Sequence, residues 1–112
     1  MSNARENVIR LNDSVSADNG DADATLVWGE DETTQVWATT LTVDRTVTLS
    51  TTNAVNGARF HILRKLSAAG VFDLSIGTGP LITLPIGNEW CDVQYDGSAW
   101  IVVAYGTIYV AP

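Results

Sequence analysis

Between residues 57 and 106 the chain consists of short apolar or alternating segments separated by turn residues, and this spacing constrains the fold most. The segments are GARFHILRKL, VFDLSI, LITLPI, EWCDVQY and SAWIVVAY. Glycine, proline, asparagine and aspartate separate them, and no helical period extends beyond two turns. Short strands with frequent turn signals are typical of an all-β sandwich or barrel. We therefore expect a small antiparallel sandwich or barrel over residues 25–112.

The last two segments show the alternation most clearly. Apolar and polar residues alternate from Trp90 to Tyr95, and Asp96-Gly97 supplies a turn that tolerates positive φ. From Trp100 to Tyr105 both parities are apolar, which is typical of a strand covered on both faces. One cover would be the core, and the other a second sheet or an identical neighbour. We predict that Trp90, Trp100 and Tyr105 lie in the core or in subunit contacts.

Residues 1–24 have a different composition and are expected to form an extended N-terminal arm. The formal net charge of the chain is -7, and most of it falls within residues 1–32, which hold eight acids and two bases. A small, polar, acidic segment cannot bury enough surface to order itself. Its apolar residues Val8, Ile9 and Leu11 are predicted to order on a neighbouring protein, with a frayed terminus as the alternative.

Charge and composition also argue against several partners. An acidic surface repels nucleic acid, because affinity for phosphate comes mainly from lysine and arginine. No run approaches the roughly 20 apolar residues of a membrane helix, and the first residues do not resemble a signal peptide. Cys91 is the only cysteine, so no intrachain disulfide can form. We expect a protein made in the cytoplasm that binds neither nucleic acid nor membrane.

The sequence contains no recognisable set of catalytic residues. His61 is the only histidine and lies on the polar parity of its strand, whereas Cys91 lies on an apolar parity, where cysteine acts as a small hydrophobe. Residues 19–30 have a partial calcium-loop register, but Ala24 occupies the position that needs glycine. A solvated acidic segment is the default, with a weak calcium site as the alternative. We predict no catalytic residue, no cofactor and no metal.

Three stretches between Leu41 and Thr107 carry a resemblance to a known family: LTVDRTVTLSTTNAVNGARFHILRK, AAGVFDLSIGTGPL and LPIGNEWCDVQYDGSAWIVVAYGT. In their order and spacing they resemble a module common in tailed-bacteriophage virion proteins. The module is found in head-decoration (cement) proteins and in tail-fibre and spike proteins. The resemblance implies a compact β fold, usually trimeric, without enzymatic activity.

The length of the chain favours one of these two locations. A short arm followed by one β module is similar to a capsid cement protein, whereas fibres and spikes are normally long chains. We therefore expect a non-enzymatic homotrimer on the capsid surface of the virion that binds the major capsid protein and stabilises the head. The alternative is a tail-fibre or spike module that binds a host receptor or carbohydrate.

Overall fold

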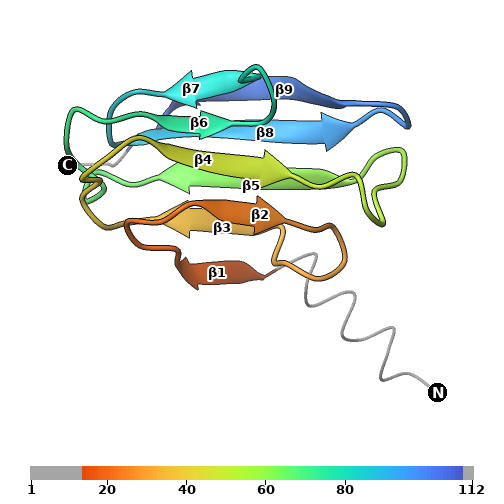
Figure 1. Cartoon of the computed structure of the whole chain (residues 1–112), viewed down its shortest axis with the longest axis horizontal. Helices are drawn as coiled ribbons and strands as arrows, with labels where there is room; N and C mark the ends of the chain where they lie inside the picture. Colours follow the sequence, from red (N-terminus) through yellow and green to blue (C-terminus); the bar gives the residue numbers. More distant parts are fainter. Residues whose placement is uncertain (1–13, 110–112) are drawn as a thin grey trace.

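Two β-sheets pack face to face as a sandwich, and the first six strands of the chain alternate between them (Figure 1). The computed structural model describes residues 14–109, and within this range it contains strands and turns but no helix. The strands are β1 (Val15–Asp18), β2 (Ala24–Leu26), β3 (Thr34–Trp37), β4 (Arg45–Leu49), β5 (Arg59–Arg64), β6 (Leu74–Ile76), β7 (Ile82–Leu84), β8 (Glu89–Tyr95) and β9 (Trp100–Thr107). The expectation of an all-β sandwich is confirmed.

The first six strands wind through both sheets as three coils of two strands each. Strands β1, β3 and β5 lie parallel in one sheet, and β2, β4 and β6 lie parallel in the other. Strands β7, β8 and β9 then add antiparallel neighbours, which gives the sheet orders β1-β3-β5-β8-β9 and β2-β4-β6-β7. The prediction of an antiparallel sandwich is therefore wrong about strand direction, because both sheets are mixed.

This difference arises because alternation along a strand fixes which side chains face the core but does not choose the neighbouring strand. Asn56-Gly57 is a strong hairpin signal in the sequence. Gly57 does adopt a positive φ of 93°, but the chain crosses there from β4 in one sheet to β5 in the other. Parallel neighbours need a crossover connection, and here a strand of the opposite sheet provides it.

The sandwich begins earlier than the sequence indicates. Strand β1 and the start of β2 fall within the segment predicted as an arm over residues 1–24. Three aspartates order this polar segment by accepting main-chain N–H groups: Asp18 from Ala38 at 2.8 Å, Asp21 from Thr42 at 3.2 Å and Asp23 from Thr46 at 2.9 Å. Hydrogen bonding thus replaces the apolar burial that the segment lacks. Val8, Ile9 and Leu11 lie outside the described residues.

The core between the sheets follows the alternation expected from the sequence. On β4, Val47 and Leu49 are buried, whereas Thr46 and Thr48 are exposed. On β5, Phe60 is buried in the same way. Burying one face of each strand in this way is what stabilises a two-layer β fold.

All links between strands gather at two ends of the sandwich (Figure 1). We call the end that carries the β1–β2, β3–β4, β5–β6 and β7–β8 links the first end, which lies on the left in Figure 1. The second end carries the β2–β3, β4–β5, β6–β7 and β8–β9 links. Among the described residues there is no helix that is long and apolar enough to cross a lipid bilayer.

Candidate functional site

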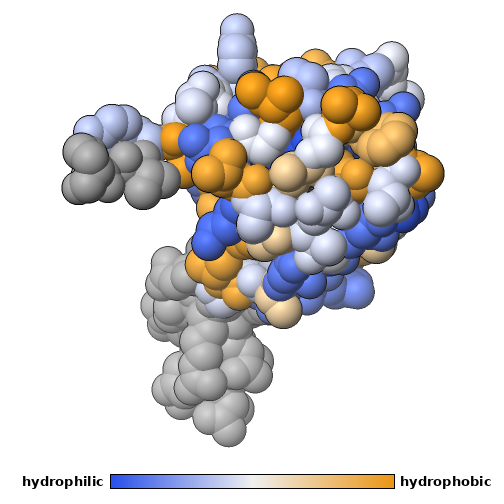
Figure 2. All heavy atoms as spheres, turned by 90° about the vertical axis from the view of Figure 1, so that its left-hand side faces the viewer, coloured by the Kyte–Doolittle hydropathy of each residue, from blue (hydrophilic) through white to orange (hydrophobic). Residues whose placement is uncertain are grey.

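Apolar side chains are exposed together at the first end of the sandwich, as Figure 2 shows from that side. Val71 is 87% exposed and Leu66 is 71% exposed, and both belong to the β5–β6 link. We define the end patch as Val43, Leu66, Val71, Phe72 and Ile86, which come from three different links. Exposed apolar residues scattered singly need no explanation, but several of them on one end of the sandwich make that end a candidate interaction surface.

A buried arginine holds the links that carry the end patch. Arg64 is fully buried at the end of β5. Its Nε donates to the carbonyl of Ala68 at 2.9 Å, and Nη1 donates to the carbonyl of Leu84 at 2.6 Å. Nη2 donates to the carbonyl of Gly70 at 3.5 Å. Burial lowers the pKa of the guanidinium, but an arginine stays charged because its usual pKa lies above 12.

The main chain of the β5–β6 link packs directly on the β3–β4 link. Leu41 donates its N–H to the carbonyl of Ala69 at 3.0 Å. Gly70 has a φ of 110°, and a Cβ added there would lie 2.9 Å from the carbonyl oxygen of Leu41. Only glycine fits such a close approach with positive φ. The end patch is therefore carried by links with a fixed geometry.

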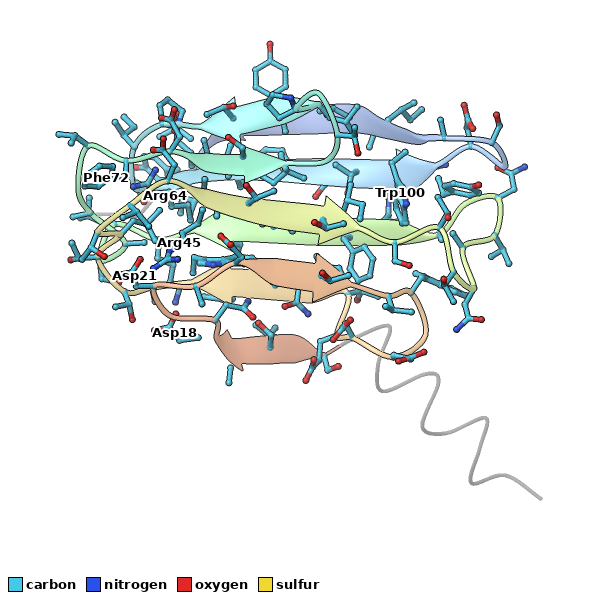
Figure 3. All side chains as sticks on the ribbon, in the orientation of Figure 1. Asp18, Asp21, Arg45, Arg64, Phe72 and Trp100 are labelled. Carbon is cyan, nitrogen blue, oxygen red and sulfur yellow. The ribbon has the colours of Figure 1, made fainter. Side chains whose placement is uncertain are left out.

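Two acidic side chains, Asp18 and Asp21, form hydrogen bonds with the β3–β4 link and with Arg45 at the same end of the sandwich (Figure 3). The guanidinium of Arg45 donates to Asp21 at 2.9 Å, and the hydroxyl of Thr42 also bonds to this carboxylate. Together these donors lower the pKa of Asp21 to about 2. Hydrogen bonds from Thr39 and from main-chain N–H groups lower the pKa of Asp18 as well.

Side chains of the partial calcium-loop register bond to other parts of the protein. Asp21 and Asp23 accept hydrogen bonds from the protein, and the side-chain amide of Asn19 donates to Gln35 and to the carbonyl of Val36. The described part of the chain holds no group of three or more His, Cys, Asp or Glu side chains that could bind a metal ion. These acids act as acceptors for the links instead.

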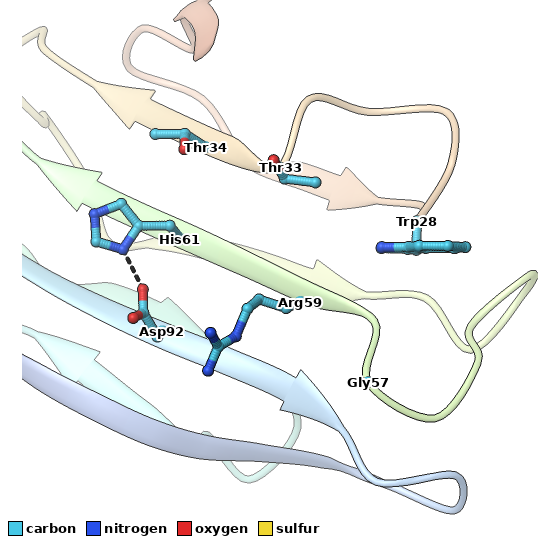
Figure 4. Close-up of a pocket in the computed structure, with 7 residues that line it drawn as sticks. All are labelled: Trp28, Thr33, Thr34, Gly57, Arg59, His61 and Asp92. Carbon is cyan, nitrogen blue, oxygen red and sulfur yellow. Dashed lines mark hydrogen bonds and ion pairs between the residues drawn. The ribbon is translucent and has the colours of Figure 1, made fainter. Parts of the chain in front are cut away.

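A second feature is a polar hollow on the outer face of the five-stranded sheet (Figure 4). Its volume is about 440 Å³. The residues that line it come from the β2–β3 link and from β3, β5 and β8: Trp28, Thr33, Thr34, Gly57, Arg59, His61 and Asp92. We call it the outer hollow.

One hydrogen bond fixes the histidine of the outer hollow. Nδ1 of His61 bonds to a carboxylate oxygen of Asp92, which lies opposite it on the neighbouring strand. An ionised carboxylate only accepts, so Nδ1 carries the proton and neutral His61 keeps Nε2 as an acceptor. Arg59 is exposed beside this pair, and its guanidinium makes no hydrogen bond or ion pair with residues 14–109.

The predicted aromatic residues lie in three different environments. Trp100 is in the core, 5.7 Å from Phe60 between ring centroids, and its Nε1 donates to the carbonyl of Ser50 at 3.1 Å. Trp90 is half-buried on the outer face, packed against Gly106. Tyr105 is 72% exposed, so residues 14–109 leave it largely uncovered.

Strand β9 exposes apolar side chains on both of its faces at the edge of the five-stranded sheet. Ile101 and Val103 are each 41% exposed, and Tyr105 is more exposed still. A β-bulge shifts the register of this strand, so that Ile101 pairs with outward-facing Gln94, whereas Tyr105 pairs with Cys91, which faces the core. The sequence parity that placed Ile101, Val103 and Tyr105 on one face is therefore broken by the bulge. Residues 14–109 leave these side chains uncovered, so a neighbouring molecule is the candidate cover.

Cys91 has none of the properties of a nucleophile. It is fully buried on β8, and burial raises the pKa of its thiol to about 12. The thiolate is the reactive form, and burial disfavours it here. Cys91 therefore contributes to packing, as its apolar parity indicates.

No known protein family, curated protein or solved structure matches this chain. The end patch, the exposed apolar side chains of β9 and the outer hollow are therefore the features from which a function can be inferred.

Proposed function

We propose that the protein is a non-enzymatic structural component of a tailed-phage virion, which decorates the capsid surface and stabilises the assembled head. The observation that carries this proposal is the end patch, an apolar surface left bare on links that are otherwise fixed. The resemblance of residues 41–107 to phage virion modules supports it. In this proposal the end patch contacts the major capsid protein.

The geometry of the end patch favours a macromolecular partner. Its side chains project from links that Arg64 and Gly70 hold in place, so little conformational entropy is lost when a partner binds. A hollow of about 490 Å³ beside Leu66, lined also by Asn88 and Ile108, offers a recess for a side chain of the partner. A protein that binds only the assembled shell stabilises that shell by mass action.

We also propose that the protein forms a homotrimer, as the resemblance implies, through the edge strand β9. Ile101, Val103 and Tyr105 are exposed along this edge, with Ile101 and Tyr105 on opposite faces of the strand. Aromatic and apolar residues are enriched at the centre of subunit interfaces, and most oligomers close with cyclic symmetry. Trp90, half-buried on the adjacent strand, would extend this contact.

Co-sedimentation with phage capsids that lack the protein tests the role of the end patch. Replacing Leu66 and Val71 with serine removes two anchors, and we expect the dissociation constant to rise about tenfold or more. Val55→Ser is the matched control, because Val55 is 51% exposed but lies in the β4–β5 link at the second end. Equal binding by both variants would reject the end patch as the contact.

A truncation tests the role proposed for Val8, Ile9 and Leu11. Because β1 begins at Val15, the deletion should remove residues 1–13 only. We expect weaker capsid binding with an unchanged midpoint of urea unfolding. Capsid binding equal to that of the full chain would exclude these three residues from the contact.

The second candidate is a tail-fibre or spike module that binds a host receptor or carbohydrate. The observation that favours it is the outer hollow, which combines an indole with polar side chains. A glycan array separates the two candidates. Specific glycan binding that is lost in Trp28→Ala, with no binding to capsids, favours the fibre module, whereas capsid binding, with or without glycan binding, favours the decoration protein.

A further inference from the structure

We infer that the outer hollow binds a carboxylate-bearing sugar unit, such as a hexuronic acid, with Arg59 as the carboxylate ligand. The inference does not depend on capsid binding, because the hollow lies on the outer face of the five-stranded sheet and the end patch lies at the first end (Figures 1 and 4). Three properties of the lining residues carry it.

The first property is a guanidinium without a bonded partner. Arg59 projects from β5 beside the hollow and makes no hydrogen bond or ion pair within residues 14–109. A guanidinium pairs with a carboxylate through two parallel hydrogen bonds. Arg59 is the one arginine or lysine among the described residues that line the hollow, and the carboxylate of Asp92 lines it too, so a ligand with a single negative charge, placed at Arg59 and away from Asp92, fits better than a polyanion.

The second property is a set of side chains that can form hydrogen bonds with the hydroxyl groups of a sugar. Nε2 of His61 points away from Asp92 in Figure 4 and can accept a hydrogen bond from a ligand hydroxyl. Asp92 fixes the ring, so the acceptor is already oriented before a ligand arrives. The side chain of Thr34 lines the same hollow from β3 and adds a hydroxyl.

The third property is an apolar wall of suitable size. Trp28 bounds the hollow at the side nearest the second end (Figure 4), where its indole offers contact to the C–H groups of a sugar ring. The volume of about 440 Å³ falls within the range of small-molecule sites. Because the hollow is open, we expect weak binding, with a dissociation constant on the order of 1 mM.

Titration of the full chain, followed by two-dimensional NMR, tests the inference with three probes. Sodium D-glucuronate should shift the resonances of His61 and of the Trp28 indole and saturate. D-glucose, which lacks the carboxylate, and acetate, which lacks the ring, should each bind at least about tenfold more weakly. No shift with glucuronate, or equal affinity for glucose or for acetate, would overturn the assignment.

Two matched variants separate the role of Arg59 from general charge. Arg59→Gln should raise the dissociation constant for glucuronate about tenfold. Lys65→Gln, which removes an exposed cation at the first end, should leave it unchanged. Equal effects would show that the chain's overall charge attracts the probe and would refute the site. Arg59→Gln should also keep full capsid binding, so that a failure of either proposal is recognised separately.

Discussion

Arg64 satisfies three main-chain carbonyls at the first end of the sandwich. Replacing it with methionine keeps most of the volume but leaves the carbonyls of Ala68, Gly70 and Leu84 without their donor. We expect Arg64→Met to lower the free energy of unfolding by about 3 kcal/mol, because buried acceptors without partners are costly. Urea unfolding measures this change.

The control for this substitution is Arg59→Met on the same strand. Arg59 is exposed and has no partner among the described residues, so its replacement should change the stability by less than about 0.5 kcal/mol. Similar losses in both variants would show that the buried hydrogen bonds of Arg64 contribute little to the fold.

The lowered pKa of Asp21 leads to a second prediction at the residue scale. Its pKa is lowered from 3.8 to about 2 by Arg45 and Thr42, so the folded state favours the ionised form. The resulting stabilisation is present above the unfolded pKa, near 4, and is lost as the pH falls through about 2. The stability difference between the wild type and Asp21→Asn should therefore be largest above about pH 5 and shrink towards pH 2.

Urea unfolding of both proteins across this pH range measures the difference. A difference that stays constant with pH would contradict the proposed ionisation of Asp21. Asp18, whose pKa is also lowered, should add to the acid sensitivity that remains in the variant.

The hydrogen-bonding roles of Arg64 and Asp21 could not be predicted from the sequence, because their partners lie on other segments of the chain. Arg64 shares the parity of Phe60 and Ile62, and this parity was the available signal that it points inward. Of its carbonyl partners, Ala68 and Gly70 belong to a loop and Leu84 ends β7 in the other sheet, and the sequence defines neither the path of that loop nor this crossing between sheets. Asp21 belongs to a segment whose composition predicts disorder, and its partners Thr42 and Arg45 lie about twenty residues further along the chain.

At the scale of elements, the packing of one link on another depends on glycine. Gly70→Ala should be strongly destabilising, because the added Cβ would lie 2.9 Å from the carbonyl oxygen of Leu41 at a φ of 110°. Gly57→Ala is the matched control, since Gly57 also has a positive φ of 93° but has nothing within 4 Å of the added Cβ. Backbone strain alone should cost about 1 kcal/mol at Gly57, and Gly70→Ala should cost at least about twice as much. Equal melting temperatures for the two variants would contradict the close approach.

The sequence predicted the strands better than their arrangement. The alternation in β4, β5 and β8 identified the buried faces, and the Asp96-Gly97 turn correctly joined β8 to β9. The parallel pairs were missed because the partner of a strand depends on crossings between sheets, which leave no local signal. Strand β1 was missed because it is short and its residues are mostly polar or exposed.

At the scale of the whole molecule, the two ends and the two sheet edges are chemically different. The first end carries the end patch, and β9 leaves apolar side chains uncovered at one edge of the five-stranded sheet. We expect the protein to sediment as a trimer at micromolar concentration, because this edge needs a partner and the resemblance to phage virion modules implies three subunits. Val103→Lys should shift the equilibrium towards the monomer, since a charge is depleted from interface cores. A wild-type protein that sediments as a monomer would contradict the trimer.

The proposed location on the capsid is tested most directly by electron cryomicroscopy of virions with and without this protein. The proposal predicts additional density on the outside of the head, in trimers, with the end that carries Leu66, Val71 and Ile86 facing the major capsid protein. Unchanged heads, or difference density confined to the tail, would contradict it.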